Sequence, residues 1–475
     1  MLFHSLEFVL LFLPLCVLGF QGFGRLGPGP ARLFLLAASL VFYGVWDWRY
    51  LALLGTSLAV NHGLGQALQR TRSRGLLTLG ILANLGSIAY FKYADFFLDT
   101  VNQLGGSFEL LHIVLPLGIS FFTFQQISYL VETWRGEVAC RDFTEYALFI
   151  TFFPQLIAGP IVRFGEIVPQ LREDRFGQAS SPLLAAGAFM FVIGLSKKVL
   201  LADPLAALAS PAFAVVDAGL LLDPVEAWVG LLAYAFQIYF DFSGYSDMAI
   251  GLGLMFGVDI PANFDAPYTS TSIVEFWRRW HITLSSFLRD YLYLPLGGNR
   301  LGRVRRYANL SIVMLLGGLW HGASWNFVIW GGLHGLYLMV NHAWRHVGGR
   351  REPSTLGTLG WGGLTFLSVC VAWVFFRAET LGGALRMLQS LAGTGGPPDA
   401  VVLVLSLMTA APALVLAGAI TWRAPTSIEL LRRFREAPDG APPDLWRPVA
   451  MGVLLATSLF LVFAGAHSEF IYFQF

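Results

Sequence analysis

The chain has 475 residues, of which 56% are hydrophobic and only 13% are charged, and its formal net charge is +1. Soluble globular domains carry about 25% charged residues, so this composition excludes an ordinary soluble enzyme and indicates an all-α polytopic membrane protein. A spanning helix needs about 20 apolar residues, which leaves room for roughly ten to twelve membrane-spanning or partial helices. The three cysteines lie far apart without CxxC spacing, so we expect neither a metal site nor a disulfide framework.

The first apolar run, MLFHSLEFVLLFLPLCVLGF, has no basic residue before its apolar core. We therefore expect an uncleaved first span and no cleaved signal peptide. Broken segments are tolerated at membrane depth only where protein or a water-filled cavity covers the freed backbone. Some of the short runs and of those interrupted by Pro116, Pro154 and Pro160 are therefore expected to be tilted or partial and to line a cavity, although 153–163 could equally be only a kink. The remaining apolar runs, in chain order, lie at about 33–46, 50–64, 75–98, 111–131, 143–162, 183–202, 225–256, 307–320, 323–343, 361–377, 399–421 and 448–466.

Basic residues cluster in the short segments between these runs. Cytoplasmic loops carry an excess of Lys and Arg. Two apolar runs separate the first two clusters, which fits a helical hairpin with both clusters in the cytoplasm and the N-terminus outside. The clearest clusters are Arg25 with Arg32, then Arg70, Arg72 and Arg74, then Arg300, Arg303, Arg305 and Arg306, and finally Arg423, Arg432, Arg433 and Arg435.

The run FDFSGYSD at 240–247 places Asp241 and Tyr245 among serines inside an apolar region. These residues could bind a polar ligand or pair with the arginines near 278, but a structural polar cluster between helices is the favoured interpretation. A Ser-His-Asp triad through Ser243 or Ser246 stays open, although no GxSxG elbow is present. HExxH, Walker A and GxGxxG signatures are also absent, so zinc hydrolysis and nucleotide-loop chemistry lack support.

One histidine, His281, lies in the aromatic and basic segment 275–299. This segment mixes apolar side chains with Arg278, Arg279 and Asp290, which is typical of a helix that lies at the membrane interface or lines a funnel. In a funnel, His281 would position a substrate carbonyl or a partner side chain. In an anchor helix, the arginines would only meet lipid phosphates. The residues alone leave both interpretations open.

A second histidine, His321, lies in the apolar stretch LLGGLWHGASWNFVIW at 315–330. An ionisable side chain in a membrane segment is costly and marks a functional site by default. We expect a neutral imidazole that accepts a proton from a hydroxyl as a general base. The glycines around it would let helices approach closely and leave room for a substrate. A core histidine hydrogen-bonded between helices is the alternative.

Long motifs follow one another in order through the chain, and the terminal FIYFQF (470–475) and N-terminal MLFHSLEFVLLFLP add to them. The motifs are SYLVETWRGE (128–137), PQLIAGPIVRF (154–164), YFDFSGYSDMAIGLGLMFG (239–257), PANFDAPYTSTSIVEFWRRWHITLSSFLRDYLYLPLGGNR (261–300) and GGLWHGASWNFVIWGGLHG (317–335). Together they resemble the membrane-bound O-acyltransferase family, in its bacterial alginate O-acetylation branch.

The resemblance implies one integral-membrane domain over 1–475, with core motifs within about 115–345. Its helices would surround a central funnel or tunnel that joins both membrane faces. His321 would be the catalytic base, which deprotonates a hydroxyl that attacks an acyl thioester, and His281 a catalytic group that polarises or positions. The oxyanion would meet a donor such as an indole or a backbone N–H. The candidates for substrate binding are Trp320, Trp325, Asp241, Tyr245, Arg278, Arg279 and Asp290.

The resemblance also implies the reaction and its partners. A cytoplasmic thioester, with acetyl-CoA as the first choice and no bound cofactor, would supply the acyl group. The acceptor would be a hydroxyl of an exopolysaccharide, or of a periplasmic or extracellular acetyltransferase partner that completes the transfer. The protein would cross the lipid bilayer of a bacterial inner membrane several times, and no nucleic-acid partner is expected. D-alanyl transfer from a carrier protein to teichoic acid is the alternative within the family.

Two alternative interpretations assign the chain to other classes of protein. A transporter or channel would also use broken helices and glycine-rich packing, but it predicts a carboxylate site at membrane depth. The polar groups in the apolar runs here are mainly histidines and tryptophans. A scaffold that anchors a polysaccharide synthase is the other reading. Loss of activity in a folded His321→Ala variant would argue against both.

Overall fold

The computed structural model describes residues 1–178, 180–347, 354–397, 400–436, 446–465, 468, 470 and 471. Within these ranges the chain is helical and contains no β-strand, which confirms the all-α prediction. The chain divides into two compact units, each assembled from three separate segments. Unit 1 comprises Met1–Leu195, Tyr245–Ala262 and Leu431–Phe463, and unit 2 comprises Ser196–Gly244, Asn263–Leu430 and Ala464–Phe475. The single domain expected from the sequence stays a prediction.

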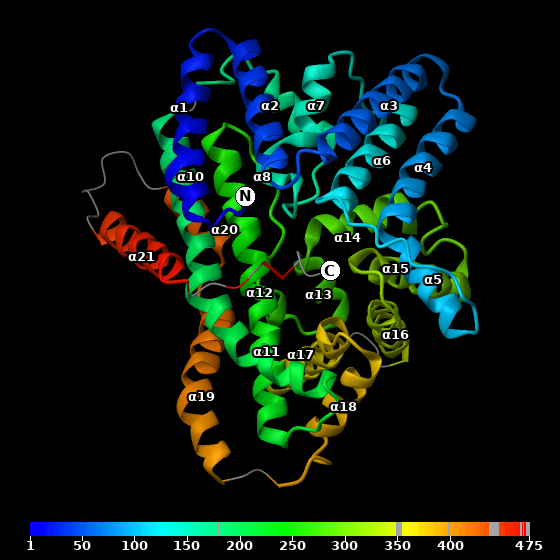
Figure 1. Ribbon diagram of the computed structural model, residues 1–475, viewed down its shortest axis with the longest axis vertical. Helices are drawn as coiled ribbons and strands as arrows, with labels where there is room; N and C mark the ends of the chain where they lie inside the picture. The colour runs from blue at the N-terminus through cyan, green and yellow to red at the C-terminus, as the bar shows by residue number, and fades with distance from the viewer. Residues whose placement is uncertain are drawn as a thin grey trace. The chain divides into compact units, whose positions relative to one another are not determined.

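Unit 1 begins with a helical hairpin formed by α1 and α2. Helices α3, α4 and α6 lie side by side (Figure 1). Its elements are η1 (Phe8–Phe12), α1 (Leu13–Gly24), α2 (Pro28–Gly44), α3 (Tyr50–Thr71), α4 (Arg74–Ile88), η2 (Ala89–Tyr93), α5 (Ala94–Gln103), α6 (Ile119–Arg135), α7 (Phe143–Thr151), α8 (Phe153–Leu156), α9 (Phe164–Leu171), α10 (Ser181–Ser196) and α21 (Trp446–Phe463).

Local sequence explains several boundaries in unit 1. Ser73 caps α4 by accepting a hydrogen bond from the Leu76 N–H, as expected for a helix N-cap. Pro154 lies in the first turn of the short helix α8, so the chain breaks between α7 and α9 as the sequence predicts. The Phe153 ring beside this break packs against Phe42 of α2 at a centroid distance of 5.3 Å. The break is therefore covered by apolar side chains.

Unit 2 carries both histidines singled out in the sequence. Its elements are η3 (Lys197–Ala202), α11 (Asp203–Asp217), η4 (Pro267–Thr269), α13 (Ile273–Arg279), α14 (Ile282–Leu288), η5 (Arg289–Tyr293), α15 (Gly302–His321), α16 (Trp325–Val347), α17 (Thr355–Arg377), α18 (Leu381–Leu391) and α19 (Ala400–Arg423). Helices α12 (Pro224–Met255) and α20 (Ser427–Arg435) contribute residues to both units, and the last residue of α10, Ser196, belongs to unit 2.

Four helices in the described ranges are long and apolar enough to cross a membrane by length and composition. They are Arg74–Gln103, Ser181–Asp217, Thr355–Arg377 and Leu403–Arg423, and shorter apolar helices run over Phe8–Gly24 and Pro448–Phe463. Leu79 and Leu82 on the first of these helices are about three-fifths exposed, as expected for a surface that faces lipid. The total of roughly ten to twelve spans and the central tunnel stay predictions.

Candidate functional site

His281 and His321 lie together in unit 2, although 40 residues separate them in the sequence. His281 precedes α14 as its N-cap residue, and His321 is the last residue of α15. Their ring centroids are 6.4 Å apart, with an angle of 58° between the ring planes. His281 is fully buried and His321 is 5% exposed. The two imidazoles therefore border one buried site.

Asn263 fixes the tautomer of His281. The Asn263 Oδ1 atom accepts hydrogen bonds from the Thr283 N–H at 3.3 Å and the Thr283 hydroxyl at 2.9 Å, and it lies 3.1 Å from His281 Nδ1. Because an amide oxygen only accepts, Nδ1 must carry the proton and donate it. The opposite nitrogen, Nε2, is then an acceptor, and it is buried without a hydrogen-bond partner in the described part of the chain.

The backbone conformation of His281, a neighbouring ring and burial also define the state of its imidazole. Its backbone is left-handed, with φ 43°, a conformation that costs free energy for a residue with a Cβ and often occurs at functional sites. The Phe242 ring meets the imidazole edge to face at 4.8 Å. His281 lies outside the four candidate spans, and burial lowers its pKa to about 3. The imidazole is therefore neutral at physiological pH.

Aromatic rings enclose His321 on several sides. The centroids of Trp320 and Trp330 lie 5.0 Å from that of His321, and the centroid of Phe376 lies 5.2 Å away. Trp330 and Phe376 come from α16 and α17, so three helices meet at this imidazole. The rings keep water from its faces, and a charge that develops there is only weakly screened.

Glycines bring α15 and α16 into close contact beside His321. A Cβ atom built at Gly318 would overlap the carbonyl oxygen of Phe327, and one built at Gly331 would overlap that of Met314. Backbones approach this closely only where side chains are absent. The prediction that the glycines permit close helix packing is confirmed, and this packing sets Trp330 against His321.

The tryptophans divide into buried and exposed positions. Trp320 is 6% exposed, whereas Trp325 begins α16 with 49% of its surface exposed. One residue that the sequence interpretation missed is Trp330, which is 1% exposed and packs edge-on against His321. Its indole N–H has no hydrogen-bond partner among the described residues. Only the turn between α15 and α16 brings this position to the site.

His334 is a second residue that the sequence interpretation missed. It is fully buried, and its Nδ1 accepts a hydrogen bond of 3.2 Å from the Trp277 indole N–H. Its ring lies 4.7 Å from Trp330, which in turn contacts His321. The same argument that singled out His321, an ionisable group in an apolar run, applies to His334 and could have found it.

Asp241 occupies a buried ionic cluster in unit 2. Lys198 Nζ lies 2.9 Å from Asp241 and 2.9 Å from Asp203. Asp241 also accepts a hydrogen bond of 2.7 Å from the Ile471 N–H, and Ser468 donates to Asp203. These contacts agree with the structural interpretation of this polar run. Of the terminal FIYFQF segment, only Phe470 and Ile471 lie within the described residues.

The other predicted substrate-binding residues have separate surroundings. Tyr245 belongs to unit 1, where its ring stacks on Phe3 at 4.7 Å. Arg279 pairs with Glu275 at 3.0 Å, and both Arg279 and the exposed Arg278 line a cavity of about 400 Å³ beside α13. Asp290 pairs with its neighbour Arg289 at 2.6 Å. Their roles in binding substrate stay predictions.

Comparisons with known proteins identify the family of this chain. Residues 77–376 match the family described as MBOAT, the membrane-bound O-acyltransferase family. A probable alginate O-acetylase of Azotobacter vinelandii is 46% identical, covering 83% of this chain and 79% of the relative. A peptidoglycan O-acetyltransferase of Helicobacter pylori is 42% identical over 83% and 80%. A teichoic acid D-alanyltransferase of Streptococcus thermophilus is 30% identical over 48% and 57%.

Proposed function

This chain belongs to the membrane-bound O-acyltransferase family and is a membrane O-acyltransferase, and we propose that it acetylates an exported polysaccharide. The acetyl group would come from a cytoplasmic thioester, with acetyl-CoA as the first choice. It would pass to a hydroxyl of an exopolysaccharide or of a periplasmic partner that acetylates the polymer. The observation that carries the proposal is the buried pair of His281 and His321, in the motifs that the family shares.

In the proposed mechanism, His321 acts as the general base. It takes the proton of the acceptor hydroxyl while the hydroxyl oxygen attacks the thioester carbonyl. A C–O bond forms, the C–S bond breaks, and the thiolate leaves with the proton that His321 accepted. The aromatic wall of Trp320, Trp330 and Phe376 supports this role, because a base that is positioned in a dry site needs little reorganisation.

His281 is proposed to position the acceptor. Its Nε2 atom is a buried acceptor, since Nδ1 carries the proton and donates a hydrogen bond to Asn263, so Nε2 suits a hydrogen bond from the incoming hydroxyl. This favours positioning over polarisation, because a neutral imidazole with this tautomer offers no N–H to a carbonyl at Nε2. The developing oxyanion would meet the indole of Trp320 or Trp325 or a backbone N–H, and the Trp330 indole is a further candidate.

The relatives support an acetyl group and a cell-envelope polymer. Two of them are named for O-acetylation, of alginate and of peptidoglycan, and each is more than 40% identical to this chain. The relative named for D-alanyl transfer matches less of the chain, so that reaction is the second candidate. Because the family consists of acyltransferases, the transporter and scaffold interpretations are set aside. We propose that it is a multi-pass protein of a bacterial inner membrane.

The test is the acetyl content of envelope polysaccharides in a deletion strain that expresses wild type, His321→Ala or His281→Ala. Loss of the general base should lower acetylation by roughly 10²–10⁴-fold. His346→Ala is the matched control, because His346 is an exposed histidine in the last turn of α16. Membrane abundance of each variant is measured by immunoblot. Full acetylation by an abundant His321→Ala protein would contradict the mechanism.

A further inference from the structure

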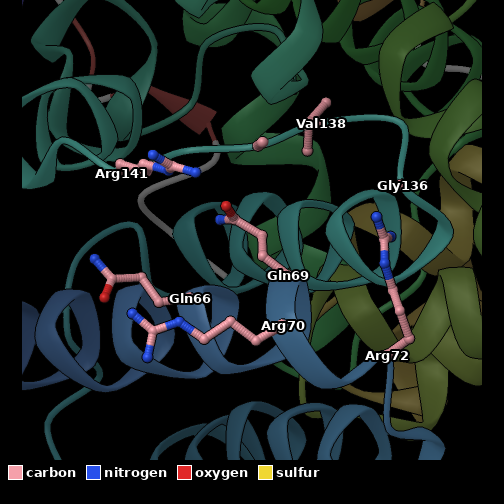
Figure 2. Close-up of a pocket in the computed structure, with 8 residues that line it drawn as sticks. Gln66, Gln69, Arg70, Arg72, Gly136, Val138 and Arg141 are labelled. Atoms are coloured by element: carbon pink, nitrogen blue, oxygen red, sulfur yellow. The ribbon is translucent and has the colours of Figure 1, made fainter.

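A cavity of about 590 Å³ opens in unit 1, and none of the residues assigned to acyl transfer lines it. It lies between the C-terminal end of α3 and the loop that follows α6 (Figure 2). Among the described residues, three arginines and no carboxylate line it. The lining residues are Gln66, Gln69, Arg70, Arg72, Gly136, Val138, Ala139 and Arg141.

One of these arginines, Arg72, forms part of the cavity wall. Arg72 ends α3 in a left-handed conformation, and its guanidinium donates to the carbonyl oxygens of Thr133 and Trp134 at the end of α6. The Trp134 indole N–H donates back to the Arg72 carbonyl at 2.9 Å. Gln69 donates across the cavity to the carbonyl of Cys140 at 2.9 Å, which ties α3 to the loop. The cavity is therefore preformed.

The other two arginines are available to a ligand. Arg70 and Arg141 are exposed, and within the described residues neither forms a hydrogen bond or an ion pair. Figure 2 shows them on opposite sides of the cavity, Arg70 on the helix and Arg141 on the facing loop. The nearby carboxylate of Glu137 lies 4.0 Å from Arg135 and does not line the cavity. The positive charge of this cavity is thus not neutralised from within.

The position of the cavity along the chain indicates which anion it receives. The candidate span Arg74–Gln103 begins two residues after Arg72. Arg74 lies over the ring of Trp134 at 6.0 Å. Arginine and tryptophan at the end of a membrane helix mark the interface with water, where lipid phosphates lie. Guanidinium groups pair with phosphate oxygens through two parallel hydrogen bonds, which favours phosphate over a smaller anion.

We propose that this arginine cavity binds a phosphate group through Arg70 and Arg141. Two sources share this chemistry: the headgroup of an anionic phospholipid, and a soluble phosphate-bearing molecule such as the nucleotide portion of coenzyme A. A volume of about 590 Å³ suits either group, since small-molecule pockets span roughly 300–1,000 Å³. The lipid source stands independently of the acyl-transfer mechanism, whereas the coenzyme A source rests on the proposed function.

The experiment uses the full chain purified in detergent, and native mass spectrometry measures how much ligand it retains. One arm titrates cardiolipin and phosphatidylglycerol against phosphatidylcholine, and the other titrates adenosine 3′,5′-bisphosphate. The test variant is Arg70→Gln with Arg141→Gln. The control is Arg25→Gln with Arg175→Gln, which removes the same charge from exposed positions of unit 1. Thermal unfolding verifies that all variants are folded.

A contribution of about 1 kcal/mol from each arginine predicts about 30-fold weaker binding in the test variant and little change in the control. Loss in the lipid arm would identify a headgroup site, and loss in the nucleotide arm would identify a soluble ligand. Either result supports the proposal. The proposal would be overturned if wild type and test variant retained equal amounts of ligand in both arms. It would also be overturned if wild type retained phosphatidylcholine as well as the anionic lipids, or if the control variant lost as much binding as the test variant.

Discussion

A single amide decides which nitrogen of His281 carries the proton. Replacing Asn263 by Leu would remove the oxygen that accepts the hydrogen bond from the Nδ1–H, so the imidazole could change tautomer and Nε2 would no longer be a fixed acceptor. We expect acetyl transfer in membranes to fall by about 10- to 100-fold, comparable to losses from other supporting hydrogen bonds at active sites. Thr283→Val is the control, since it leaves the Asn263 oxygen beside His281. Activity equal to wild type in Asn263→Leu would refute the tautomer argument.

The lowered pKa of His281 predicts how stability depends on pH. The unfolded chain binds the proton near pH 6.5, whereas the folded protein binds it only near pH 3. Between these values the unfolded state binds more protons, so the free energy of unfolding falls as pH is lowered from about 6.5 towards about 3, by up to about 1.4 kcal/mol per pH unit. The unfolding midpoint of His281→Gln in detergent should therefore depend less on pH than that of wild type. Parallel curves for the two proteins would contradict this.

At the scale of elements, the close contact of α15 and α16 holds His321 in place. Gly318→Ala would insert a Cβ against the Phe327 carbonyl, which must force the two helices apart. Overpacking of this kind costs about 1–3 kcal/mol, and we expect a lower unfolding temperature together with reduced acetyl transfer. Gly332→Ala is the matched control on α16, because its Cβ would make only an ordinary contact with the Leu315 side chain. Equal effects of the two substitutions would show that the contact at Gly318 is not critical.

An ionic contact links elements of unit 1. Glu145 in α7 binds Arg32 of α2 at 2.7 Å and Arg172, the residue after α9, at 2.8 Å. Its side chain is 9% exposed, so Glu145→Gln would leave two arginines without their carboxylate and lower the free energy of unfolding by roughly 1.5–3 kcal/mol. Glu137→Gln, which breaks an exposed pair with Arg135, should change stability by less than about 1 kcal/mol. Thermal unfolding of both variants distinguishes these outcomes.

At the scale of the whole molecule, the ionic cluster at Lys198 joins buried charges from separate elements of unit 2. Lys198→Met would leave Asp203 and Asp241 buried without their cation, which costs about 3–5 kcal/mol. We expect the protein to be strongly depleted from membranes. Asp241→Asn keeps the shape and the Ile471 contact, so it should lower the amount of protein more than its activity per molecule. Normal abundance with lost activity in Asp241→Asn would instead indicate a role in binding substrate.

The sequence by itself determined the class of protein, the helical fold and the break at Pro154, and it singled out His281 and His321 as candidate site residues. These features follow from composition and from short-range patterns, because burial of apolar residues and proline geometry act locally. The shared motifs carried the family assignment, which the comparisons confirm.

Only the tertiary structure decided which groups surround the histidines. Trp330 and His334 reach the site because α16 packs back on α15, Asn263 lies beside His281 from 18 residues earlier in the chain, and Lys198 pairs with Asp241 although the two are 43 positions apart in the chain. The arginine cavity likewise joins the end of α3 to a loop about 70 residues later. Such contacts depend on the free energy of packing whole helices together, which no local pattern of residues encodes.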